Sequence, residues 1–163
     1  MNKYKAKNKI YYSIINNSKK WSRRLKKVSK IIKRILENQK YFINDKCKYY
    51  NITFLLTDNK RIKKLNKTYR NKQKPTDVLT FTSFQKINNH EIIRFCDIVI
   101  SATIIKYDAE KLKINFYDHL THIIIHALLH SNQHKHNTEK NYKKMKSLEI
   151  SILKKLNIKN PYN

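Results

Sequence analysis

The sequence contains no glycine, only two cysteines and no long apolar run. Cys47 and Cys96 are widely separated, which argues against a disulfide framework and a CxxC metal site and suits a reducing compartment. No segment approaches the roughly 20 apolar residues of a membrane span, and the basic N-terminal segment lacks the apolar run of an export signal. The sequence therefore predicts a cytoplasmic protein with no membrane partner.

Acidic residues are scarce, since 11 Asp and Glu stand against 37 Lys and Arg, and the formal net charge is +26. A dense Lys and Arg surface binds polyanions through counterion release, so nucleic acid is the expected class of partner. The absence of glycine and the many Lys, Asn and Ile residues indicate compositional bias as another source of this charge. The electrostatic field is the same with either origin.

The length of 163 residues and the apolar content of 40% fit one domain, residues 1–163, with one hydrophobic core. Apolar runs predict four strands, at 10–15, 50–57, 78–84 and 95–100. The last two are expected to pair antiparallel across a turn at 86–91. Helical spacing of apolar residues predicts helices at 21–39, 60–70, 101–111, 116–129 and 138–156, and Asp58 is expected to cap the second. This pattern is typical of a single compact α+β domain.

Metal-ligating side chains are concentrated in one segment, because every histidine except His90 lies within residues 119–136. His126 and His130 are four residues apart, so a helix places both imidazoles on one face. A turn after His130 can bring a third imidazole from His136, which leaves the fourth position of a tetrahedral zinc ion open for water, as in catalytic sites. The segment therefore predicts one zinc ion held by His126, His130 and His136 and used for hydrolysis.

The neighbouring residues argue for other roles. His119 and His122 are expected to be core residues satisfied by hydrogen bonds, and His134 to be solvated or to support a ligand. Ala127 stands where a zinc protease of the H-E-x-x-H type has its general base, so the sequence argues against that class. Zinc deaminases are disfavoured too, because their cysteine ligands are missing.

Four segments of the chain follow known patterns. The histidine segment, HALLHSNQHKH at 126–136, keeps the three histidines and a leucine of H-G-x-L-H-L-x-G-Y-D-H. The segment LNKTYRNKQKPTDVLTF at 65–81 matches N-x-x-Y-R…x-P-T-D-V-L-S-F almost residue for residue, and CDIVIS at 96–101 and MKSLEISIL at 145–153 match a strand and a closing helix. On these residues the chain resembles the YbeY family of endoribonucleases, also called ribosomal RNA maturation factors.

This resemblance implies a small mixed four-stranded sheet flanked by helices, one zinc ion on three histidines, and no further cofactor. It implies single-strand-specific endoribonuclease activity in ribosomal RNA processing, maturation and ribosome quality control. The implied partners are ribosomal RNA and the small ribosomal subunit, without DNA specificity. Arg70 matches the arginine that lines the family's catalytic cleft. A guanidinium there can hold a phosphate bidentately and stabilise its developing charge.

Other residues near these motifs carry weaker expectations. Thr76 and Asp77 are expected to bind local backbone groups at the start of a strand, which is a structural role. Asp97 is a candidate for orienting a histidine ring. Their assignment from sequence rests on residue type alone.

The chain departs from the histidine pattern in the turn that must deliver His136. Gln133 replaces a glycine, and Asn132 is expected to supply the positive φ one position earlier. Lys135 replaces an aspartate and is expected to weaken cation binding. These departures favour an alternative function, a ribosome-assembly RNA-binding protein with a structural metal and little catalysis.

Overall fold

The structure, a computed structural model, describes residues 8–43, 47–89, 91–132 and 137–162. The strands are β1 (Lys9–Asn16), β2 (Tyr49–Thr57), β3 (Val78–Asn88) and β4 (Glu91–Ser101). The helices are α1 (Lys19–Ser22), α2 (Leu25–Leu36), α3 (Asn59–Arg70), α4 (Ala102–Leu112), α5 (Phe116–Ser131) and α6 (Glu139–Lys155), with a short 3-10 helix η1 (Gln39–Tyr41).

The four strands form one sheet in the order β1-β2-β4-β3. β1, β2 and β4 run parallel, whereas β3 pairs antiparallel with β4. The parallel pairs need crossover connections, and α1 with α2 provides the first while α3 and β3 lie within the second. The predicted small mixed sheet flanked by helices is therefore confirmed.

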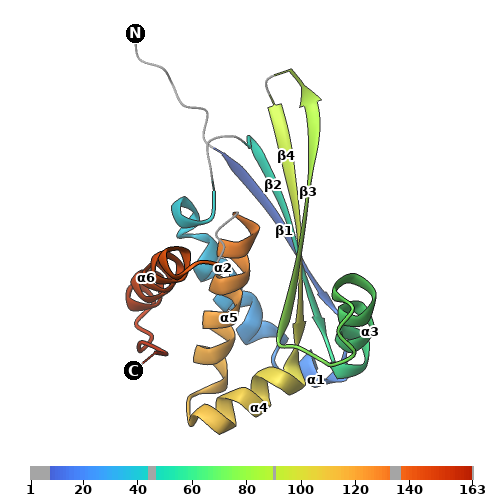
Figure 1. Ribbon diagram of the computed structural model, residues 1–163, viewed down its shortest axis with the longest axis vertical. Coiled ribbons are helices and arrows are strands. Elements are labelled where there is room, and N and C mark those ends of the chain that lie inside the picture. Colours follow the sequence, from blue (N-terminus) through green and yellow to red (C-terminus); the bar gives the residue numbers. More distant parts are fainter. Residues whose placement is uncertain (1–7, 44–46, 90, 133–136, 163) are drawn as a thin grey trace.

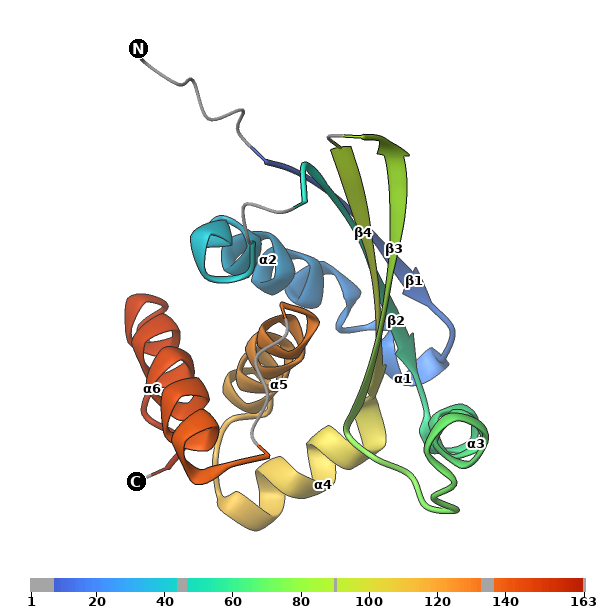
Figure 2. The same cartoon turned by 45° about the horizontal axis from the view of Figure 1, so that its top comes forward.

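The two faces of the sheet bury different amounts of apolar surface. α5 packs against the sheet with α2 and α6 beside it, and α3 lies across the opposite face (Figures 1 and 2). The larger core lies on the α5 side and includes alternate residues of β2 and β4, such as Phe54 and Ile98. The smaller core, under α3, is formed by Ile62, Leu79 and Val99. Helix α5 is therefore the central helix of the fold.

The predicted helix at 21–39 is wrong in its continuity. The chain forms α1 and α2 with a turn at Arg23 and Arg24 between them. Trp21 is fully buried, and its indole Nε1 donates a hydrogen bond of 2.8 Å to the Thr57 carbonyl at the end of β2. The turn lets α1 keep this anchor while α2 presents its own apolar face to α5.

The hairpin between β3 and β4 is longer than predicted. Antiparallel pairing is confirmed, but the strands continue to Asn88 and from Glu91 through most of the expected turn, with a register shift between Lys86 and Asn88. The added part of β3 is exposed, whereas on β4 Ile92 packs against the larger core and Arg94 is buried. The polar residues of the expected turn therefore do not end the ladder of backbone hydrogen bonds. Within the described part of the chain, no helix has the length and apolar character needed to cross a bilayer.

Candidate metal centre

Helix α5, which carries His126 and His130, is largely buried and apolar. Asn115 caps its first turn by accepting a hydrogen bond of 2.8 Å from the Tyr117 amide. Leu120, Ile124 and Leu128 are fully buried, and burial of each such side chain contributes about 1.5–3 kcal/mol. Their packing holds the helix against the sheet, so its polar face is fixed in direction.

His126 and His130 lie side by side on that polar face, one helical turn apart. Their ring centroids are 4.5 Å apart, with an interplanar angle of 80°. Both side chains are partly buried. Two imidazoles this close supply neutral nitrogen ligands of the kind that zinc prefers, so this donor pair fits a transition-metal ion. The structure therefore brings together two of the three histidines predicted to hold zinc.

The third predicted ligand, His136, lies outside the described residues, as do Gln133, His134 and Lys135. Among the residues that the structure describes, no group of three or more His, Cys, Asp or Glu side chains has an arrangement suited to a metal ion. A centre with three histidines thus remains a prediction, as does the effect of Lys135.

A buried carboxylate on α6 contacts two histidines of α5. Glu149 is only 1% exposed. Its Oε1 lies 2.7 Å from Nδ1 of His126, and its Oε2 lies 2.9 Å from Nε2 of His122 and accepts a hydrogen bond from the Tyr162 hydroxyl. Burial raises the pKa of Glu149, but the hydrogen bonds from His122, His126 and Tyr162 outweigh burial and lower it to about 2. Glu149 is therefore an ionised acceptor.

This contact determines which nitrogen of His126 can bind a metal. An ionised carboxylate only accepts hydrogen bonds, so Nδ1 of His126 must donate. In the neutral ring the lone pair then lies on Nε2, the arrangement of carboxylate–histidine–zinc sites. Burial and the nearby carboxylate raise the pKa of Tyr162, so its hydroxyl also stays a donor.

The two histidines nearer the start of α5 differ from each other. His122 is hydrogen bonded to Glu149, as expected for a satisfied core histidine. His119 is 6% exposed, and neither of its ring nitrogens has a partner among the described residues. Burial lowers the pKa of His119, which favours the uncharged ring. The predicted hydrogen bond is thus confirmed for His122. His119 lies in the core as predicted, but the predicted hydrogen bond is not found among the described residues.

Arg70 lies on α3, on the other side of the sheet from α5 (Figure 1). It is the last residue of the helix and is exposed. Buried Asn66 donates a hydrogen bond of 2.7 Å to the Lys74 carbonyl, and Asn71 ends the helix at a left-handed φ of 54°. The motif around Arg70 therefore shapes the turn from α3 towards β3. A role of Arg70 in the same cleft as His126 stays a prediction.

The acidic residues near these motifs are structural or remote. Asp77 accepts hydrogen bonds from the Thr76 hydroxyl at 2.9 Å and from the Val78 amide at 2.7 Å, which agrees with the predicted structural role of both residues. Asp97 is exposed on β4 and is paired in register with Phe81, which packs under α3. Asp97 therefore faces away from α5 and does not orient the histidines of that helix.

The C-terminal end of α5 is held from the sheet by Arg94 of β4. This side chain is 1% exposed, and its Nη1 donates to the Ser131 carbonyl at 2.7 Å and to Oδ1 of Asn132 at 3.1 Å. Its guanidinium carbon lies 4.6 Å from the Phe84 ring centroid and 5.8 Å from that of Tyr50. A basic group at a helix C-terminus binds the last carbonyls and complements the helix dipole.

The expected positive φ at Asn132 is wrong, since its φ is −94°. Its amide binds the carbonyls of Leu128 and Leu129 instead, and its side chain accepts from Arg94. A left-handed residue is not needed at this position because the terminal carbonyls already have donors.

Sequence reasoning missed Glu149, Tyr162 and Arg94. Glu149 had a visible cue, because an acidic residue stands between Met145 and Ile152 at helical spacing on the apolar face of α6. Tyr162 and Arg94 had none, since their partners are distant in sequence.

The fold and the histidine pair define an α+β domain with a candidate metal centre on its central helix. The family model described as endoribonuclease YbeY matches residues 13–157. An endoribonuclease YbeY of Bartonella bacilliformis is 41% identical over 112 residues, 68% of this chain and 71% of that protein. The endoribonuclease YbeY of Pelagibacter ubique is 37% identical over 148 residues, 89% of this chain and 95% of that protein.

A solved structure shares the fold. The solution structure of TM1509 from Thermotoga maritima has a TM-score of 0.57 and 20% sequence identity, covering 94% of this chain and 96% of that chain. With the family model and these relatives, the chain belongs to the endoribonuclease YbeY family.

Proposed function

We propose that this protein is a zinc-dependent, single-strand-specific endoribonuclease that acts in ribosomal RNA processing and maturation. Family membership supports the endoribonuclease activity. The observation that carries the metal dependence is the pair His126 and His130, with their ring centroids 4.5 Å apart and Nδ1 of His126 held by Glu149. A histidine oriented by a carboxylate in this way is typical of zinc ligands.

The proposed mechanism assigns a separate task to each side chain. His126, His130 and His136 would hold the ion, which when bound supplies Lewis acidity for a phosphate oxygen or an attacking water. Arg70 would bind the phosphate bidentately and stabilise charge that develops on its oxygens. The general base is left unassigned, because Glu149, the carboxylate in contact with His126, already accepts hydrogen bonds from His122, His126 and Tyr162.

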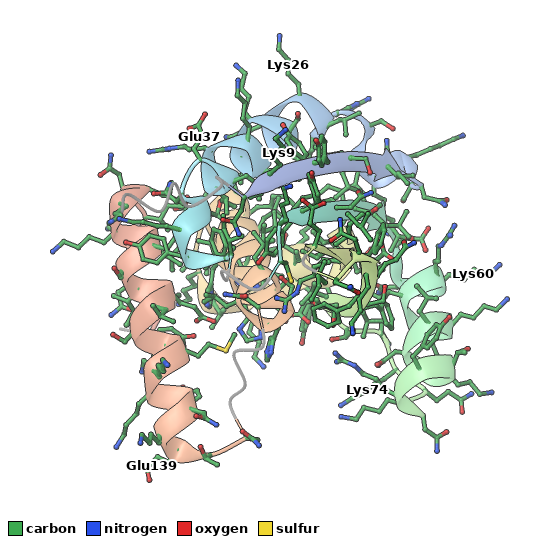
Figure 3. The ribbon with its side chains drawn as sticks, turned by 90° about the horizontal axis from the view of Figure 1, so that it is seen from above. Lys9, Lys26, Glu37, Lys60, Lys74 and Glu139 are labelled. Atoms are coloured by element: carbon green, nitrogen blue, oxygen red, sulfur yellow. The ribbon has the colours of Figure 1, made fainter. Side chains whose placement is uncertain are left out.

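The surface charge supports an RNA substrate. Lys60 and Lys74 project from α3 and the following loop, and Lys9 and Lys26 project from the side of β1 and α2 (Figure 3). With a net charge of +26, such a surface attracts a phosphate backbone in a salt-dependent manner. The proposed partners are ribosomal RNA and the small ribosomal subunit in the cytoplasm, without specificity for DNA.

The test is to measure bound zinc and cleavage of a single-stranded RNA for the wild type, His130→Ala and Arg70→Glu. Arg61→Glu is the matched control, because Arg61 is exposed on the same helix and undergoes the same change of charge. We expect His130→Ala to lose zinc, and Arg70→Glu to keep zinc but to cleave at least about 100-fold more slowly, as when a transition-state donor is removed. Arg61→Glu should stay within a few-fold of the wild type in both measurements.

Two results would reject the proposal. Equal cleavage by the wild type and both site variants, without bound zinc, would exclude a metal-dependent enzyme at this site. RNA binding that persists with a chelator, weakens steeply with salt and yields no product would instead identify the RNA-binding protein with a structural metal.

A further inference from the structure

We infer that Glu149 and Tyr162 are positioning residues of the metal centre, through which α6 and the C-terminal segment fix the ring of His126 for metal binding. The inference rests on the proposed function, because it assigns these residues to the zinc site proposed there. Neither residue would contact the metal or the RNA. Both would act through the His126 side chain.

Glu149 restricts the orientation of the His126 ring. An imidazole on a helix can rotate about its side-chain torsions and can exchange its proton between two nitrogens. The 2.7 Å contact between Nδ1 and Oε1 of Glu149 restricts both freedoms. Glu149 itself cannot move away easily, since it is 1% exposed and is also bonded to His122, one turn earlier on α5. The ring that binds metal is therefore pre-oriented.

Tyr162 holds Glu149 through the carboxylate oxygen that does not contact His126. Its hydroxyl donates to Oε2 of Glu149, and its ring meets the His122 ring edge-on at a centroid distance of 5.5 Å. The segment that leads to Tyr162 is ordered by its own backbone bonds, because Asn157 adopts a left-handed φ of 58° and the Ile158 amide donates to the Leu153 carbonyl at 3.0 Å. Tyr162 thus approaches Glu149 from a fixed turn after α6.

The surroundings of Glu149 differ from those of an ordinary core side chain. Glu149 lies on the apolar face of α6, where a leucine would bury well and avoid the desolvation of a charge. Three donors converge on its carboxylate, and two of them belong to histidines of the helix that carries the candidate ligands. Core packing alone does not require a carboxylate whose oxygens contact histidine ring nitrogens. These contacts favour a role in metal binding.

The experiment compares zinc binding by the full chain and by Glu149→Gln and Tyr162→Phe, using competition with a chromogenic chelator. Glu139→Gln is the matched control on the same helix, where Glu139 is exposed, and Tyr107→Phe is the control for a lost hydroxyl at a residue that is 60% exposed. We expect Glu149→Gln to raise the zinc Kd about 10- to 100-fold, the usual effect of removing a group that supports a ligand. Tyr162→Phe should raise it about 3- to 10-fold, and the controls less than 2-fold.

A second measurement needs no metal. In the wild-type protein without zinc, ¹⁵N NMR of the His126 ring should show the proton on Nδ1, and Glu149→Gln should show a mixture of both tautomers. A merely structural Glu149 would change thermal stability, and its contact would still fix the tautomer, but its replacement would leave the zinc affinity of the folded protein unchanged. If Glu149→Gln does not fold, Tyr162→Phe and the wild-type tautomer decide the question.

The failures of the two proposals are distinguishable. A wild type that binds no zinc would overturn the proposed function. A wild type that binds zinc through His130, with unchanged affinity in Glu149→Gln and Tyr162→Phe, would overturn only the positioning role. A proton on Nε2 of His126 in the wild type would also overturn it.

Discussion

Two buried charged side chains contact helix α5 from opposite sides, and their surroundings differ. Glu149 approaches from α6 and binds three side-chain donors, from His122, His126 and Tyr162. Arg94 approaches from β4 and binds one carbonyl and one amide oxygen, while its Nε has no partner among the described residues. The carboxylate is thus fully satisfied, whereas the guanidinium is only partly so.

The difference indicates that Glu149 and Arg94 act on different parts of the candidate site: the histidine rings and the C-terminal end of α5. Glu149 is hydrogen bonded to ring nitrogens, so it determines how the histidine rings are oriented and which ring nitrogen carries the proton. Arg94 binds the backbone at the end of α5, and aromatic rings of Tyr50 and Phe84 offset part of its charge. Arg94 therefore holds the C-terminal end of the helix, at Ser131 and Asn132, against β4.

The largest expected effect comes from replacing Glu149 by leucine. This change leaves three donors without their acceptor, and unpaired groups of this kind cost about 1–3 kcal/mol each. Since His122 and His126 are partly exposed, we expect a loss of about 3 kcal/mol in the free energy of unfolding. Urea unfolding of the metal-free protein measures it, with Glu139→Leu as the control. A loss below about 0.5 kcal/mol would remove the contrast with Arg94.

A smaller loss is expected for Arg94→Met, which keeps much of the side-chain volume. The Ser131 carbonyl loses its hydrogen-bond donor, which destabilises the fold. The variant no longer buries the partly satisfied guanidinium charge, and this offsets part of the loss. We expect the free energy of unfolding to fall by about 1.5 kcal/mol. Arg34→Met, at an exposed position of α2, is the control. A loss equal to that of Glu149→Leu would mean that the aromatic rings and carbonyls satisfy Arg94 as fully as the donors satisfy Glu149.

This contrast also explains how far the sequence alone could reach. Elements with clear periodicity, such as the strand at β2 and the helix at α5, were predicted because that pattern is local. The i, i+4 spacing of His126 and His130 was sufficient to predict that both rings lie on one face of the helix, since this pattern is also local. Glu149 contacts His126 and His122, which precede it by 23 and 27 residues in the sequence. These contacts exist only after α6 packs on α5. Periodicity contains no information on that packing.

The errors have the same physical origin. The break between α1 and α2 follows from the anchor of Trp21 on the Thr57 carbonyl, which is a contact between distant segments. The backbone at Asn132 was expected to be left-handed because the glycine of the motif is replaced. Arg94 of β4 supplies a hydrogen-bond donor to this end of α5, so a left-handed conformation at Asn132 is unnecessary.

Arg94 caps the end of α5 from a distant segment, whereas Asp58 caps the start of α3 from the adjacent position. Asp58 accepts hydrogen bonds from the Lys60 amide at 3.1 Å and the Arg61 amide at 3.2 Å, as predicted from sequence. Replacing Asp58 by alanine should lower the free energy of unfolding by about 1 kcal/mol, whereas Asp58→Asn should retain most of it. Urea unfolding of both variants measures this. An equal loss in both would show that charge, not capping geometry, matters at this position.

The smallest effect concerns Cys96, which reports on the Arg94 side of α5. Its thiol is buried, and burial raises its pKa to about 12, against a weaker opposing contact with Ser131. The native thiol is therefore protonated at pH 8 and should react with iodoacetamide only after local opening. Because the folded pKa exceeds the ordinary value of 9.0, this group contributes full stability below pH 9 and loses it between pH 9 and about 12.

Labelling of Cys96 can thus separate the two sides of the helix. Arg94→Met should speed alkylation of Cys96 at pH 8 several-fold, because Ser131 contacts both residues. Tyr162→Phe should leave the rate unchanged, since that residue acts on the α6 side. Mass spectrometry of the labelled peptide distinguishes Cys96 from Cys47, which is also buried. Equal acceleration by both variants would mean that α5 opens as one unit, so that Glu149 and Arg94 do not control separate parts of it.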